Sequence, residues 1–251
     1  MTSKTFKLMS VVLVSGLALA SQSAFSATTL TYLGAAHGEY QSGYLSYNDG
    51  AGGYPDFYGT TSGVSPQHDA RKNVYVGGFS MRNETTHQPI TAWCVDIFDW
   101  LHSASYNDGV SSNINNIDKL QQLVNRNFSK VNNATTSAAF QLAVWEIVSE
   151  TPGSTSFSLG SGRFTASNSG TGIRDLSNAI TLANDWLGLD EANTGNYKIG
   201  YYIYGNGSMP NYTTQNLITM SPVPLPAAGL LMLSALGLGG LATKRRASAK
   251  K

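Results

Sequence analysis

The sequence contains one cysteine and few charged side chains, and each shortage excludes a class of protein. Because Cys94 is alone, no disulfide can form within the chain. The 16 basic and 15 acidic residues leave a formal net charge of +1. Nucleic acid is therefore not an expected partner, since proteins that bind it carry an excess of basic side chains. No sequence pattern indicates a cofactor.

Long, uninterrupted apolar runs stand at the two ends of the chain. At the N-terminus, Lys4 and Lys7 precede an apolar run at 8–20, which is short for a membrane span. Small residues at 23–26 then provide a cleavage site for signal peptidase. We predict that residues 1–26 are a signal peptide removed after Ser26; a retained N-terminal anchor is the alternative.

The C-terminal end combines a rigid Pro-rich stretch, an apolar run and a basic cluster. Prolines alternate through 221–226, and each one fixes its own φ and extends the residue before it. Residues 227–243 carry no charge, and basic residues follow at 244–246. A run of this length can just cross a bilayer with its basic end in the cytoplasm. We therefore predict a C-terminal transmembrane helix in the tail 221–251, which is either processed or a permanent anchor.

This tail resembles the PEP-CTERM sorting signal in its VPLPA variant, in which leucine replaces the usual glutamate between two prolines. The resemblance rests on the Pro motif and the basic end: Val223, Pro224, Leu225, Pro226 and Ala227, with Lys244, Arg245 and Arg246. It implies that an exosortase, a membrane-embedded cysteine transpeptidase of Gram-negative bacteria, cuts the chain near the Pro motif. The protein would then be anchored transiently in the inner membrane before it reaches the cell surface or the extracellular matrix.

Residues 27–220 remain between the two end segments and are expected to form the extracytoplasmic body. This length suits one domain of ordinary size, or two small ones. Gly, Ser, Thr, Asn and Tyr are abundant in it, as is common in extracellular β-rich proteins. In an oxidising compartment, the lone Cys94 is buried and inert, paired with another chain, or used for chemistry.

Hydrophobic periodicity in the body predicts an α+β fold. Antiparallel β-sheets, in a sandwich or barrel-like arrangement, are expected with about three helices inserted between strands. Strands are predicted as two within 28–49 and one each at 73–81, 90–98, 197–204 and 213–220. Helices are predicted at 113–128, 135–149 and 173–187, and Gly- and Ser-rich loops, the second with a possible hairpin, at 50–72 and 153–172.

Two segments of the body resemble the halves of the thioester domain found in bacterial surface adhesins. The first is the predicted strand around Cys94, and the second is the predicted helix around Gln141. In that family, a cysteine on a strand condenses with a glutamine near the start of a helix, in the pattern Gln, any residue, Ala, apolar, Trp. Gln141, Ala143, Val144 and Trp145 match this pattern, whereas Phe140 replaces the usual threonine.

The resemblance implies an internal thioester that the protein uses once, rather than an enzyme with turnover. The Cys94 thiolate would attack the Gln141 carboxamide and release ammonia, which requires near-attack geometry and exclusion of water. A helix N-terminus near Gln141 would stabilise the developing oxyanion. The thioester could then acylate an amine or a hydroxyl on a target. The shielding and supporting residues would be Trp93, Asp96, Phe98, Phe140, Ala143, Trp145 and Glu146.

Other interpretations of the same residues stay open. Gln141 could be a satisfied polar group of the core and Cys94 a small buried hydrophobe, in a structural protein of an exopolysaccharide or biofilm matrix. The spacing of Asp96, Asp99 and Glu146 matches no metal loop. A Cys–His hydrolase would need a histidine beside Cys94, and no family signature surrounds that residue; the candidates are His37, His68, His87 and His102.

Overall fold

A computed structural model describes most of the body. The described residues are 27–47, 72–96, 101, 103–109, 114–189, 195, 197–204 and 214–223. The predicted signal peptide lies outside them, as does the predicted sorting tail after Val223. No helix within the described part combines the length and the apolar character that a bilayer span requires.

Six antiparallel strands close into a barrel. Around the barrel the order is β1-β4-β5-β9-β8-β6. The strands are β1 (Ala27–Ala35), β4 (Phe79–Asn83), β5 (Pro89–Cys94), β6 (Ala104–Gly109), β8 (Tyr197–Tyr204) and β9 (Leu217–Pro222). Side chains that point inward fill the barrel with a small core of its own, formed by Leu30, Met81, Ala92, Tyr106 and Leu217.

A second sheet of three antiparallel strands lies beside the barrel, in the order β3-β2-β7. The strands are β2 (Gln41–Tyr47), β3 (Lys72–Val76) and β7 (Phe164–Asn168). Helices α2 and α3 pack against this sheet. The main hydrophobic core lies between these helices and the two sheets.

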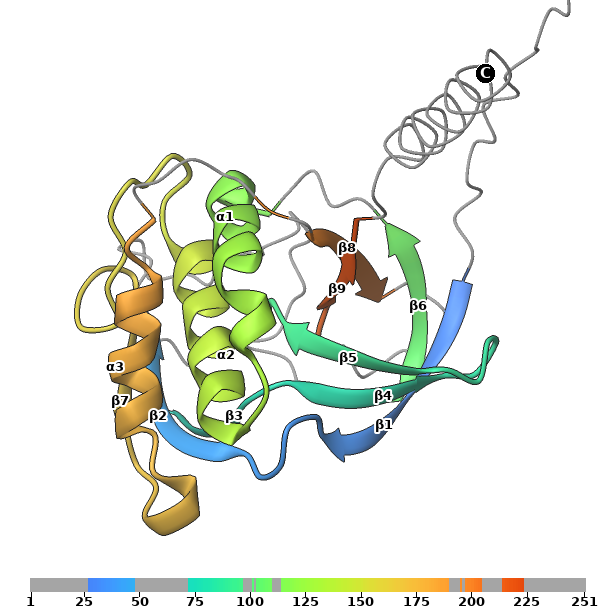
Figure 1. The fold of residues 1–251 in the computed structure, drawn as a ribbon, viewed down its shortest axis with the longest axis horizontal. Helices are drawn as coiled ribbons and strands as arrows, with labels where there is room; N and C mark the ends of the chain where they lie inside the picture. The colour runs from blue at the N-terminus through green and yellow to red at the C-terminus, as the bar shows by residue number, and fades with distance from the viewer. Residues whose placement is uncertain are drawn as a thin grey trace, which may run out of the picture.

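Three helices stand side by side on one side of the barrel (Figure 1). They are α1 (Ile117–Asn127), α2 (Ala134–Ser149) and α3 (Ser177–Trp186). Every residue of α2 from Ser137 to Ser149 is buried, because apolar residues occupy its whole circumference. A capping box starts this helix: Asn133 accepts the N–H of Thr136, and the Thr136 hydroxyl accepts the N–H of Asn133.

The C-terminus of α2 is held by Asn116, which precedes α1. Its Nδ2 donates to the carbonyls of Ile147 at 2.9 Å and Thr151 at 3.2 Å, and its Oδ1 accepts the N–H of Gly153 at 2.8 Å. Asn116 adopts the left-handed conformation with φ of 53°, which asparagine tolerates better than most residues. The side chain thus satisfies carbonyls that lack partners at a helix end.

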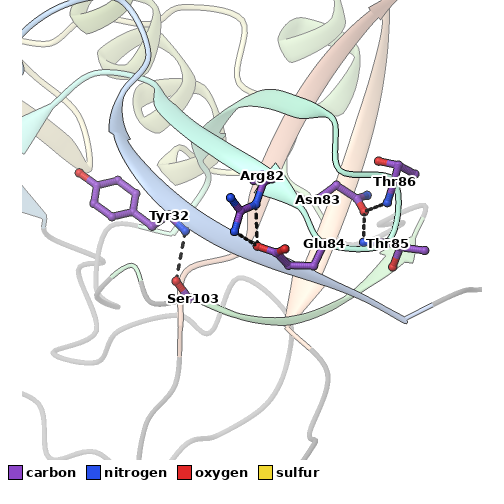
Figure 2. A network of polar contacts seen from close by, with 7 residues as sticks. All are labelled: Tyr32, Arg82, Asn83, Glu84, Thr85, Thr86 and Ser103. Atoms are coloured by element: carbon purple, nitrogen blue, oxygen red, sulfur yellow. Dashed lines mark hydrogen bonds and ion pairs between the residues drawn. The ribbon is translucent and has the colours of Figure 1, made fainter.

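The hairpin between β4 and β5 is held by an asparagine side chain, as Figure 2 shows. Asn83 Oδ1 accepts the N–H groups of Thr85 and Thr86, at 2.9 and 3.0 Å, which is a turn typical of asparagine. Nearby, the N–H of Tyr32 on β1 donates to the Ser103 hydroxyl at 3.1 Å. The first contacts thus hold the β4–β5 turn, and the last joins β1 to the residue that precedes β6.

The predicted α+β class with antiparallel sheets and three helices is confirmed, but several element boundaries were wrong. The strand predicted at 73–81 is two strands in different sheets, β3 and β4. The chain crosses between the sheets at Gly77, whose φ of 152° suits glycine. The third helix starts at Ser177 rather than 173, and Ile173, expected on its apolar face, is 71% exposed. The prediction had no strand at β6, and β7 lies within the segment predicted as a loop or hairpin.

Candidate functional site

The structure brings Cys94 and Gln141 together at the interface between the barrel and α2. Gln141 Oε1 accepts the backbone N–H of Cys94 at 3.0 Å, and Gln141 Nε2 donates to the backbone carbonyl of Cys94 at 2.7 Å. Both residues have no exposed surface. The side-chain amide of Gln141 is therefore fixed by both backbone groups of Cys94.

The backbone of Cys94 can bond the Gln141 side chain because β5 has a paired strand on only one side at this residue. On one side, β5 pairs with β9 through Cys94↔Leu217, and the next N–H, of Val95, donates to the Asn216 carbonyl. On the other side, the pairing of β4 with β5 ends at Phe79↔Ala92. The position opposite Cys94, before the first residue of β4, is therefore taken by the Gln141 side chain and not by a strand residue. Gln141 satisfies the buried N–H and carbonyl of Cys94, which would otherwise be unpaired.

The thiol of Cys94 is turned toward the backbone of Asp96. Cys94 Sγ accepts the N–H of Asp96 at 3.2 Å, and the thiol donates to the Asp96 carbonyl. The thiol is therefore held by both backbone groups of a residue two positions along the chain.

Aromatic side chains surround the residues next to the Cys94–Gln141 pair. The ring centroids of Trp93 and Phe140 are 5.2 Å apart in an edge-to-face arrangement, and both side chains are fully buried. Phe128 lies 5.5 Å from Trp93 and 5.9 Å from Phe140. His37 stacks on Trp93 at 6.0 Å. Two residues of the predicted shield, Trp93 and Phe140, therefore pack in one aromatic cluster that also contains Phe128.

Other residues that were predicted to support the site make contacts elsewhere in the fold. Trp145 packs against Phe164 of β7, with centroids 6.2 Å apart, and Ala143 is buried in the main core. Glu146 Oε1 accepts the N–H of Ser158 at 2.7 Å, so this carboxyl holds the segment that follows α2. Phe98 lies outside the described residues.

The environment of Glu146 makes it a weak acid. Burial raises its pKa to about 8; the hydrogen bond from Ser158 opposes this rise, and the neighbouring Glu150 carboxylate adds to it. Glu150 Oε1 in turn accepts the N–H of Arg163 at 2.5 Å. The two carboxyl groups thus fasten the segment 151–163 to the C-terminal half of α2.

The helix begins at Ala134, one residue before its predicted start. Gln141 lies about two turns inside it, so the terminal N–H groups are too far away to contact the Gln141 amide as predicted. The backbone N–H of Cys94 contacts Oε1 instead. The donor that an oxyanion would need therefore comes from the strand and not from the helix.

Sequence reasoning missed Ser137, which also joins α2 to the barrel. Its hydroxyl accepts the N–H of Gly78 at 2.8 Å in a buried contact. A signal for it is present in the sequence, because Ser137 is a polar residue four positions before Gln141 and therefore lies on the same helix face.

Some of the residues considered for metal binding or hydrolase chemistry lie within the described part of the structure, and others lie outside it. Burial lowers the pKa of His37, which stacks on Trp93, and His87 lies in the β4–β5 hairpin with φ of 57°. His68, His102 and Asp99 lie outside the described residues. Among the residues that are described, no cluster of three or more His, Cys, Asp or Glu side chains could hold a metal ion.

Comparison with known proteins gives one structural match. No protein-family model and no curated protein matches the chain. The matching structure is the N-terminal thioester domain of a surface protein from Clostridium perfringens, in a cysteine-to-alanine mutant, with 12% identity and a TM-score of 0.38. The match covers 72% of this chain and 99% of that one. With so low a TM-score, the proposal of function rests on the geometry of the described residues.

Proposed function

We propose that this protein is an exported bacterial surface protein that forms an internal thioester between Cys94 and Gln141 and attaches once, covalently, to a target. One observation carries the proposal: the reactive amide of Gln141 is held by the backbone N–H and carbonyl of Cys94, in a fully buried position. Such an arrangement supplies the proximity and the exclusion of water that amide-to-thioester exchange requires.

The proposed reaction joins the side chains of two residues that already contact each other through the Gln141 amide and the Cys94 backbone. The Cys94 thiolate attacks the Gln141 carboxamide carbon, and negative charge develops on Oε1, which the Cys94 N–H already contacts at 3.0 Å. Nε2 leaves as ammonia and takes up the proton that the thiol gave. A target amine would then displace the thiol to form an amide, or a target hydroxyl would form an ester, and the Cys94 thiol would be restored.

Intact-mass measurement of the purified full chain tests the thioester. We expect a mass lower than that of the sequence by one ammonia, and a Cys94 that resists alkylation after denaturation. Methylamine should add its own mass and make the thiol reactive. Cys94→Ala and Gln141→Ala are the controls, and each should show its plain sequence mass. A wild-type chain with its plain mass and a fully alkylated Cys94 would refute the proposal.

The proposed route to the surface is supported by the two end segments of the sequence. Signal peptidase would remove residues 1–26, and an exosortase would process the tail near Val223–Ala227 after transient anchoring in the inner membrane. Peptide mapping of the protein recovered from the cell surface should then lack both ends. Recovery of peptides from the basic cluster at 244–246 in the surface form would favour a permanent anchor instead.

A structural component of an extracellular matrix, without covalent chemistry, is the second candidate. It is favoured by the completeness of the contacts: both polar atoms of the Gln141 amide and the thiol of Cys94 have backbone partners. A buried polar group with all its partners is stable without any reaction. The plain sequence mass described above is the result that this candidate requires.

A further inference from the structure

Two buried polar side chains join α2 to the barrel at successive turns of the helix. Ser137 and Gln141 are four residues apart, so they project from the same face. The Ser137 hydroxyl accepts the N–H of Gly78 across 59 residues of sequence, and Gln141 contacts the Cys94 backbone across 47. The orientation of the helix on the barrel is therefore fixed at two adjacent levels.

The two contact points lie at adjacent ends of neighbouring strands, with Gly78 directly before β4 and Cys94 at the end of β5. Phe79 of β4 pairs with Ala92 of β5, so Gly78 directly precedes the last pair of this ladder, as Trp93 directly follows it. The approach is close, because a Cβ on Gly78 would lie 2.8 Å from Trp93 Cε2. A displacement of the Gly78 backbone would therefore move the indole that precedes Cys94.

The other backbone group of Gly78 is also fixed. Its carbonyl accepts the N–H of Ala36, which follows β1, at 2.9 Å, so Gly78 is held to the end of β1 on one side and to α2 through Ser137 on the other. Without the Ser137 hydroxyl, the buried Gly78 N–H would lose its partner, and α2 would lose this hydrogen bond to the barrel. The contacts of Gln141 with the Cys94 backbone would still join α2 to β5.

We propose that Ser137 is a positioning residue for thioester formation, because its hydroxyl sets the register of α2 on the barrel and so places Gln141 against Cys94. The inference rests on the proposed thioester. A misplacement of about 1 Å at a reacting centre can cost on the order of 100-fold in rate, so a small shift of α2 is enough to slow the reaction.

A pair of variants with the same shape isolates the hydroxyl. Ser137→Thr keeps the hydroxyl and Ser137→Val replaces it with a methyl group, so any crowding is common to both. In the full chain, we expect Ser137→Thr to form the thioester as the wild type does, and Ser137→Val to form it at least about tenfold more slowly. The readout is the fraction of chains that have lost one ammonia, followed over time after purification.

A second control separates positioning from stability. Asn133→Ala removes the side-chain cap of α2 and weakens the helix, but it keeps the carbonyl of residue 133 that accepts the Ser137 N–H and leaves the Ser137–Gly78 bond in place. We expect it to lower the thermal midpoint but to leave the rate of thioester formation unchanged. If Asn133→Ala slows the reaction as much as Ser137→Val does, stability and not register controls the site, and the inference is wrong.

The outcomes distinguish the two proposals. A wild type with its plain mass overturns the thioester and, with it, the role of Ser137. A wild type that has lost ammonia, together with a Ser137→Val chain that loses it at the same rate, overturns the role of Ser137 alone. If Ser137→Val does not accumulate as a folded protein, Ser137→Ala replaces it under the same criteria.

Discussion

The side-chain amide of Gln141 occupies the hydrogen-bonding position that a neighbouring strand would hold opposite Cys94. It accepts the N–H and donates to the carbonyl of the same residue, at 3.0 and 2.7 Å, as the backbone of a paired strand residue does. The contact extends the β4–β5 ladder, whose last backbone pair involves Ala92, two residues before Cys94 on β5. Packing and the proposed thioester chemistry therefore depend on the same two hydrogen bonds.

Replacing the Gln141 amide by a carboxyl group should destabilise the fold in a pH-dependent way. In a Cys94→Ala background, which excludes the thioester, Gln141→Glu loses the donor to the carbonyl at position 94. We expect a loss of about 2–3 kcal/mol in the free energy of unfolding at neutral pH. Part of it should return at acidic pH, where a protonated carboxyl donates again.

Urea unfolding of both Cys94→Ala chains at acidic and at alkaline pH measures this effect. The buried carboxyl favours its protonated form, so its contribution should fall as the pH rises. An equal loss of stability under both conditions would show that the amide donor is not what the position requires.

Ionisation of Glu146 should weaken the fold between acidic and mildly alkaline pH. Its pKa is 4.5 in the absence of burial and about 8 in the fold. Between these values the folded chain retains a proton that the unfolded chain has lost, so stability falls as the pH rises. Each pKa unit corresponds to ~1.4 kcal/mol, so the total is on the order of a few kcal/mol.

The variant Glu146→Gln isolates this contribution. Glutamine still offers an oxygen to the Ser158 N–H but does not ionise. The difference in unfolding free energy between the variant and the wild type should therefore grow in favour of the variant from pH ~5 to ~8.5. Two parallel stability curves over that range would contradict the burial and protonation described for Glu146.

Asn116 should contribute strongly to stability through its clamp on the end of α2. Asn116→Ala loses its contacts to Ile147, Thr151 and Gly153 and places alanine at a φ of 53°. We expect a loss of about 2–3 kcal/mol from the hydrogen bonds and the left-handed backbone together. Asn116→Gly keeps the backbone conformation, so the denaturant midpoints of the two variants separate the side-chain effect from the backbone effect.

A methyl group at Gly78 should disturb the aromatic cluster. Gly78→Ala places a Cβ 2.8 Å from Trp93 Cε2, and overpacking of this kind costs about 1–3 kcal/mol. Gly160→Ala is the matched control, because the nearest atom to its Cβ is Ser158 Oγ at 3.9 Å. Thermal unfolding and tryptophan fluorescence should change for the first variant and stay close to the wild type for the second.

The sequence indicates Cys94 and Gln141 through their resemblance to the two halves of the thioester-domain motif, on a predicted strand and a predicted helix. Helix geometry also explains why Glu146 does not contact Cys94 and why Ser137 does contact the barrel. Glu146 is five residues after Gln141, about 140° around the helix, so it faces the segment 151–163 and not Cys94. Ser137 lies only about 40° from Gln141, and the same reasoning places it at the barrel.

The crossing between the sheets could not be predicted from the sequence. Apolar side chains recur on both sides of Gly77, so the pattern reads as one strand, and only tertiary contacts assign β3 and β4 to different sheets. The clamp by Asn116 was missed for a similar reason, because its partners lie more than thirty residues away. Local periodicity contains no information about such distant hydrogen bonds.

The position of β9 has a mechanical consequence. This strand ends at Pro222, just before the Pro motif, and pairs with β5 through Trp93↔Ile218 and Cys94↔Leu217. Tension applied to the chain beyond residue 223 enters the domain along β9 and is transmitted first to β5 and β8, its paired neighbours. A pull on a C-terminal tether would therefore be felt at the strand that ends in Cys94 before it reaches the helices.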